Sequence, residues 1–120
     1  MTHTDSRLRV KQDGGITKVE FIDRNILDEA NIQSIGEELG AIIEADDDPK
    51  LLISFANVDH LSSAALGALI TVNNRVKAKT GKLRLADIDP QIYEVFVITR
   101  LNSLFVIHDT SDQALQRFDD

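Results

Sequence analysis

The sequence predicts one α/β domain with a mixed, mostly parallel sheet and about four helices, in the order ββαβαβαβα. The chain has 120 residues, a length typical of a single domain. Segments with the apolar pattern of strands alternate along it with segments whose apolar residues recur every three or four positions. Because strands and helices that alternate in this way are joined by crossovers, we expect parallel pairing after an initial hairpin. We treat residues 1–120 as one domain, in which residues 1–6 are expected to fray.

Two short segments near the start alternate polar and apolar residues, as strands with one buried face do. They are residues 7–11 and 16–21, and Asp13, Gly14 and Gly15 lie between them. Glycine adopts the positive φ angles of tight hairpin turns without a steric penalty. The sequence therefore predicts a hairpin of two strands.

An amphipathic helix is predicted next, with Asp28 as its N-terminal cap. Its apolar side consists of residues three and four positions apart, namely Ile32, Ile35, Leu39, Ile42 and Ile43. Pro49 stops the helical pattern, because proline removes a helical hydrogen bond and clashes with the preceding turn. Residues 51–56 form a continuous apolar run, which predicts a central strand covered on both faces.

A second helix is predicted from Ser62 or Ser63 to the residues before Gly81, which is expected to adopt the left-handed conformation at the C-terminus. Basic residues gather near the end of this helix: Arg75, Lys77, Lys79, Lys82 and Arg84. Cations at this place complement the helix dipole, and this role accounts for them more simply than an anionic partner does.

The last third of the chain is expected to contain two strands and two helices. Residues 82–86 form a short strand pattern, and Asp89 before Pro90 is typical of a helix start. Residues 104–107 predict a last strand. A capping-box pattern that begins at Thr110 predicts a final helix.

Composition and charge exclude several classes of function. The chain carries 13 Lys and Arg against 20 Asp and Glu, a net charge of −7, whereas phosphate backbones are bound by basic residues. The absence of cysteine excludes disulfides and thiolate metal sites. No apolar run approaches the roughly 18 residues that cross a bilayer, and the first residues lack the apolar stretch of a signal peptide. We therefore expect a cytoplasmic protein with no nucleic-acid partner and no membrane span.

The residue types of a catalytic or metal site are present but poorly arranged. Asp59, His60, Ser62 and Ser63 are the types found in hydrolase triads, yet triad members converge from separate elements rather than along one loop. The acidic run 46–48 lacks the glycine and the terminal glutamate of a calcium loop. We expect no enzyme activity, no metal and no cofactor.

The segment 55–67 contains more functional information than the rest of the chain. It leads from a buried strand to two hydroxyl groups at a helix start, where backbone N–H groups lack partners. Small residues follow: Ala64, Ala65, Gly67 and Ala68. One interpretation is purely structural, with a serine that caps the helix and small residues that let it pack closely. In the other, a phosphoserine adds about −1.5 to −2 charges at a helix N-terminus and changes a contact surface for a partner.

At this point the chain resembles the STAS domain of anti-sigma factor antagonists, a family that also includes stressosome proteins and the ends of sulfate transporters. The element order matches over nearly the whole chain, and segments 58–70, 81–86, 92–96 and 101–105 are similar to those of the family. The resemblance implies a small non-enzymatic protein that binds an anti-sigma factor with serine kinase activity and thereby frees a sigma factor. It also implies that phosphorylation of a loop serine by that kinase ends the binding.

Carried over by position, the phosphorylated serine of the family corresponds to Ser63, with Ser62 as the second candidate. The chain departs from the usual family loop at three positions. The family usually has aspartate where this chain has Ser62, a second hydroxyl residue where it has Ala64, and glycine where it has Ala65. The resemblance implies a partner-binding surface of Asp59, His60, Leu61, Ala64, Ala65, Leu66 and Gly67.

Two other functions stay open. The first is a STAS scaffold or accessory subunit that is never phosphorylated, as in a stressosome or beside a transporter. The second is a module that binds an anionic nucleotide or lipid head group at the same helix start, although the loop has no basic residue to support it. The sequence also leaves open whether the chain forms a homodimer.

Overall fold

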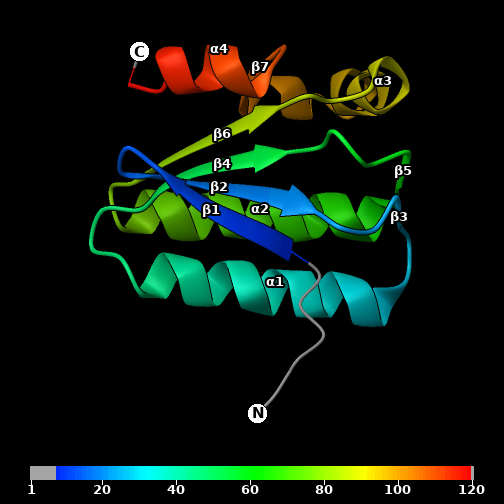
Figure 1. Cartoon of the computed structure of the whole chain (residues 1–120). Helices are drawn as coiled ribbons and strands as arrows, with labels where there is room; N and C mark the ends of the chain where they lie inside the picture. Colours follow the sequence, from blue (N-terminus) through cyan, green and yellow to red (C-terminus); the bar gives the residue numbers. More distant parts are fainter. Residues whose placement is uncertain (1–7, 120) are drawn as a thin grey trace.

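The computed structural model describes residues 8–119, so the expected fraying of residues 1–6 lies outside the described part of the chain. A five-stranded sheet forms the centre of the molecule (Figure 1). Its strands, in spatial order, are β1 (Leu8–Asp13), β2 (Ile16–Phe21), β4 (Lys50–Ser54), β6 (Lys82–Ala86) and β7 (Val106–His108). β1 and β2 pair antiparallel, and the other neighbours pair parallel. This confirms the mixed, mostly parallel sheet.

Helices lie on both sides of the sheet. In Figure 1, α1 (Glu29–Glu44) and α2 (Ser63–Ala78) run side by side under one face of it. On the other side are α3 (Pro90–Ile98) and α4 (Ser111–Gln116), and α4 contacts β4, β6 and β7. The four expected helices are thus present, and β4 occupies the expected central position.

Two strands of two residues were not predicted. β3 (Asn25–Ile26) and β5 (His60–Leu61) pair in parallel as a separate small sheet. They belong to the connections that leave β2 and β4, and both lie at the same end of the molecule in Figure 1. This pairing joins the segment that carries the candidate serines to the chain before α1.

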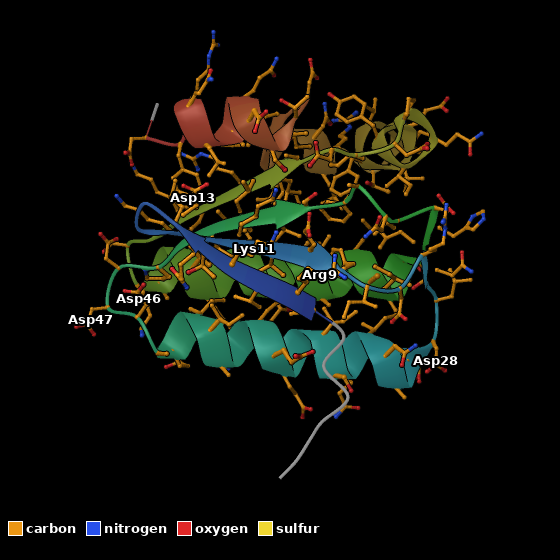
Figure 2. All side chains as sticks on the ribbon, in the orientation of Figure 1. Arg9, Lys11, Asp13, Asp28, Asp46 and Asp47 are labelled. Atoms are coloured by element: carbon orange, nitrogen blue, oxygen red, sulfur yellow. The ribbon has the colours of Figure 1, made fainter. Side chains whose placement is uncertain are left out.

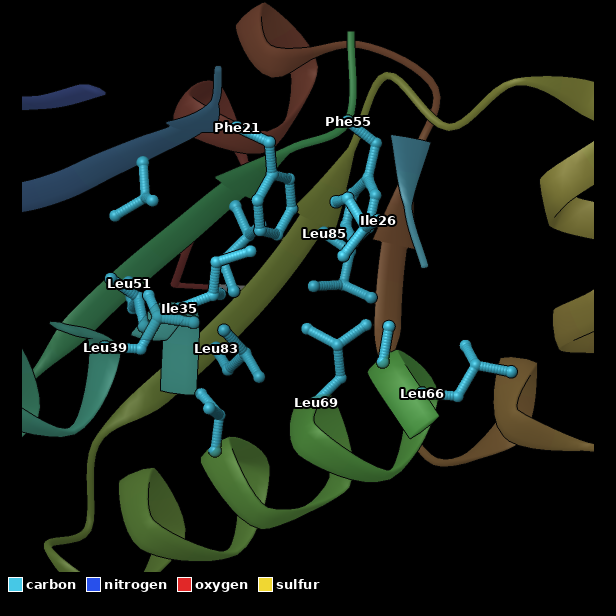
Figure 3. Packing of buried hydrophobic residues seen from close by; sticks show 14 of the residues in the cluster. Phe21, Ile26, Ile35, Leu39, Leu51, Phe55, Leu66, Leu69, Leu83 and Leu85 are labelled. Atoms are coloured by element: carbon cyan, nitrogen blue, oxygen red, sulfur yellow. The ribbon is translucent and has the colours of Figure 1, made fainter. Parts of the chain in front are cut away.

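The main core lies between the sheet and the pair α1 and α2 (Figure 3). It includes Phe21, Phe55, Leu69 and Leu85, and the rings of Phe21 and Phe55 are 5.2 Å apart. A smaller apolar cluster under α4 contains Leu52, Ala86, Ala114 and Phe118. Because the core covers β4 on both faces, the candidate loop begins at a firmly packed strand.

The predicted caps are confirmed. Asp28 precedes α1 and accepts a hydrogen bond from the N–H of Asn31 at 3.3 Å; Figure 2 shows it at the start of the helix. Asp89 caps α3, and Thr110 caps α4 through the N–H of Gln113 at 3.1 Å. In each case the side chain satisfies an N–H group that the first helical turn leaves unpaired.

The left-handed residue after α2 is Thr80, with φ of 56°, so the assignment of this role to Gly81 was wrong. Glycine is nevertheless required at position 81, because a Cβ there would overlap the backbone oxygen of Pro49. The last strand is also displaced from the predicted residues 104–107. A 3₁₀ turn, η1 (Leu101–Ser103), precedes it, and β7 begins only at Val106.

The basic residues near the end of α2 do not form one solvated face. Arg84 is buried on β6, 5.3 Å from the ring centre of Phe118, and donates a hydrogen bond to the Phe118 carbonyl. Its burial lowers the pKa of the guanidinium, an effect that Asp119 opposes. Lys79 donates from Nζ to the carbonyl oxygens of residues 43, 44 and 46 at the end of α1.

Candidate functional site

The two candidate serines have different positions at the start of α2. Ser62 is the N-cap, with extended backbone, and its Oγ accepts a hydrogen bond from the N–H of Ala65 at 3.2 Å. Ser63 is the first helical residue and is exposed. Its hydroxyl forms no hydrogen bond within residues 8–119. The cap interaction therefore occupies Ser62, whereas the hydroxyl of Ser63 is exposed and forms no hydrogen bond within the described residues.

The helix start leaves two backbone donors available. The first helical hydrogen bond runs from the N–H of Leu66 to the carbonyl of Ser62, and the Ser62 side chain satisfies Ala65. Within the described residues 8–119, the N–H groups of Ser63 and Ala64 donate to no acceptor. Free N–H groups and the positive end of the helix dipole favour an anion at this place.

The segment before α2 is attached to the connection between β2 and α1. The N–H groups of Asp59 and His60 donate to the Arg24 carbonyl at 2.7 and 3.2 Å, and that of Ser62 donates to Ile26 at 3.1 Å. Arg24 Nε also pairs with the Asp59 carboxylate at 2.9 Å. The sequence analysis missed Arg24, since 35 positions separate it from Asp59 and no local pattern marks the pair.

The residues predicted to bind a partner divide into exposed and buried ones. Asp59, His60, Ala64 and Gly67 are exposed, and Leu61 is partly buried. The side chains of Ala65 and Leu66 face the core, with 4% and 5% of their surface exposed. The exposed small residues of α2 therefore lie on a surface beside Ser63, while the two buried ones hold the helix on the sheet.

Two exposed apolar residues that were not predicted lie on the connection from β2 to α1, which pairs with the segment before α2. Leu27 is 55% exposed and Ile22 is 48% exposed, on either side of β3. Leu27 follows Ile26, whose carbonyl accepts the N–H of Ser62, so its backbone adjoins the start of α2. The apolar area exposed on this connection is available to a protein that contacts the start of α2.

Asp59, which belongs to the hydrolase pattern considered in the sequence, is engaged in an ion pair. Asp59 pairs with Arg24 rather than with a histidine, and within residues 8–119 no three acidic or histidine side chains gather as metal ligands. Figure 2 shows Asp46 and Asp47 on the loop after α1, at the end of that helix opposite Asp28. Within residues 8–119, no helix has the length and apolarity needed to cross a membrane.

Comparisons with known proteins point to one family. The family model for the STAS domain matches residues 7–114, which is most of the chain. BtrV of Bordetella bronchiseptica, which carries a provisional name as an anti-sigma factor antagonist, is 24% identical over 95 residues. The match covers 79% of this chain and 81% of BtrV.

Solved structures have the same fold. An anti-sigma factor antagonist (STAS) domain protein of Planctomyces limnophilus superposes with a TM-score of 0.85 and 22% identity, over 94% of this chain and 98% of the other. The phosphorylated form of SpoIIAA, a cell fate determinant of Bacillus, gives a TM-score of 0.68 and 15% identity, over 92% and 98% of the two chains.

Proposed function

The chain belongs to the STAS domain family, and from that premise we propose that it is an anti-sigma factor antagonist whose binding is controlled by phosphorylation of Ser63. The observation that carries the proposal is the exposed hydroxyl of Ser63 beside two free N–H groups, on a surface of small and apolar residues. The relative BtrV is named as an antagonist, and SpoIIAA has been solved in a phosphorylated form. Both names support the proposal.

In the unphosphorylated state, the surface around Ser63 is suited to close contact with a protein. Ala64 and Gly67 have little or no side chain, so a partner backbone can approach α2, and Leu27 offers apolar area to bury. The partner we propose is an anti-sigma factor with serine kinase activity. The antagonist then acts by binding and performs no catalysis itself.

Phosphorylation would change this surface without disturbing the fold. A phosphate brings about −1.5 to −2 charges and strongly hydrated oxygens. The N–H groups of Ser63 and Ala64 and the helix dipole stabilise that charge, so α2 stays folded. A partner packed on Leu27 and Gly67 would have to desolvate the phosphate, and the complex would dissociate.

Affinity capture from the native host tests the proposal with three forms of the protein: wild type, Ser63→Asp and the control Gln116→Glu. Gln116 is an exposed residue of α4, so the control adds the same charge on the other side of the sheet. We expect wild type and control to capture an anti-sigma factor, and Ser63→Asp to capture at least about ten-fold less, the equivalent of about 1.4 kcal/mol. Equal capture by all three would contradict the switch and support a constitutive STAS scaffold.

A further inference from the structure

Asp87 lies at the junction of three elements. It directly follows β6, is partly buried, and has a left-handed backbone with φ of 60°, which aspartate and asparagine tolerate better than other side chains. Its carboxylate accepts hydrogen bonds from Ser54 Oγ at 2.7 Å and from the N–H of Ser111 at 3.0 Å, and it also accepts the Ser111 hydroxyl. Ser54 ends β4 and Ser111 begins α4.

The same hydrogen bonds continue into the segment that carries the candidate serines. Ser54 is 1% exposed, and its Oγ accepts the N–H of Ala56 at 3.3 Å. Two residues later the N–H of Val58 donates to the carbonyl of Phe55 at 3.0 Å. A continuous chain of hydrogen bonds thus runs from α4 through Asp87 and Ser54 to the N–H of Ala56, which lies within the turn that Phe55 and Val58 close.

A carboxylate has a specific role in this chain of hydrogen bonds. Since a carboxylate only accepts, it directs the hydroxyl protons of both Ser54 and Ser111 toward itself. The lone pairs of Ser54 Oγ are then left for the N–H of Ala56. Both hydroxyls donate to Oδ2, and the N–H of Ser111 donates to Oδ1. An amide at position 87 has one acceptor oxygen and an NH2 group, so either both hydroxyls turn and accept from the NH2 group or the N–H of Ser111 loses its acceptor.

We propose that Asp87 is a positioning residue that holds the start of segment 55–62 and links it to α4. The far end of this segment is held by Arg24 and Ile26, as described above. With both ends held, Ser63 is presented in one orientation, which lowers the entropy cost of binding a partner or a kinase. The consequence for binding rests on the proposed function, whereas the positioning of the segment does not.

Amide hydrogen exchange measured by NMR tests the proposal at the N–H groups of Ala56 and Val58. The variant Asp87→Asn keeps the side-chain size and the tolerance of positive φ. We expect it to accelerate exchange at both N–H groups by about ten-fold or more, which corresponds to the loss of one hydrogen bond to a charged group. Ser111→Ala should accelerate it as well, although the N–H and hydroxyl of Ser111 donate to Asp87 rather than to the segment. Exchange at Leu52 in β4 reports on global stability and serves as the reference.

Asp112→Asn is the matched control, because it makes the same carboxylate-to-amide change beside Ser111 at an exposed position of α4, where the side chain has no hydrogen bond within residues 8–119. We expect exchange at Ala56 and Val58, relative to Leu52, to stay as in wild type in this variant. Unchanged exchange in Asp87→Asn, or an equal rise in Asp112→Asn, would overturn the proposal. Neither result depends on a partner protein, so failure here and failure of the phosphorylation switch can be distinguished.

Discussion

The roles of Ser62 and Ser63 can be separated by replacing each with alanine. Ser62→Ala removes the oxygen that accepts the N–H of Ala65, a residue only 4% exposed. Loss of an N-cap serine costs about 0.5–2 kcal/mol of the free energy of unfolding, and we expect 1–2 here, because the N–H is left without an acceptor in a buried place. Ser63→Ala removes an oxygen with no partner within residues 8–119 and should change stability by less than about 0.5 kcal/mol.

Urea unfolding followed by far-UV circular dichroism measures both changes. The urea midpoint should fall for Ser62→Ala with an unchanged m-value. In a thermal scan the melting temperature should fall by about 4 °C for each kcal/mol lost at this chain length. Ser62→Asp is the control, since aspartate caps helices as well as serine does and should restore the midpoint. If Ser63→Ala destabilises the protein as much as Ser62→Ala, the assignment of the cap is refuted.

Three further predictions concern stability away from the site. Lys79→Met should lower the free energy of unfolding by about 1–3 kcal/mol in urea titrations, because Nζ bonds three carbonyl oxygens, and Lys77→Met, at an exposed position, should be neutral. Asn73→Leu should raise the melting temperature, because Asn73 Nδ2 is buried without a partner in residues 8–119; a lower value would contradict this. A hydrogen bond from Lys82 lowers the pKa of Asp119 from its usual value, so this carboxylate stabilises the fold above its unfolded pKa and the effect is lost as pH falls through the folded value. Asp119→Asn should therefore reduce the loss of stability on acidification, and an unchanged pH dependence would exclude that contribution.

Most of the fold could be predicted from the sequence because its long elements have clear periods. The apolar spacing from Ile32 to Ile43 favours an amphipathic helix, and the short continuous run 51–56, bounded by Pro49, favours a buried central strand; both formed. β3 and β5 could not be predicted, because two residues are too few to show a period. The left-handed residue after α2 was misassigned for a similar reason. Glycine is needed at position 81 because Pro49, distant in sequence, comes close to it, while Thr80 takes the positive φ angle.

The candidate site was predicted in outline but not in detail. Both Ser62 and Ser63 suit a helix start, and only the observed backbone shows that Ser62 is the cap and Ser63 the first helical residue. The ion pair of Arg24 with Asp59 depends on the pairing of β3 with β5. Contacts of this kind join residues more than thirty positions apart and leave no local signal in the sequence.

Mass spectrometry of the protein purified from its native host tests the central claim most directly. Intact mass followed by fragmentation across the peptide with Ser62 and Ser63 locates any added phosphate of about 80 Da. We predict that the phosphate is found on Ser63 and that Ser62, whose oxygen caps α2, is unmodified. Phosphate on Ser62 alone, or none under any growth condition, would contradict the proposed switch.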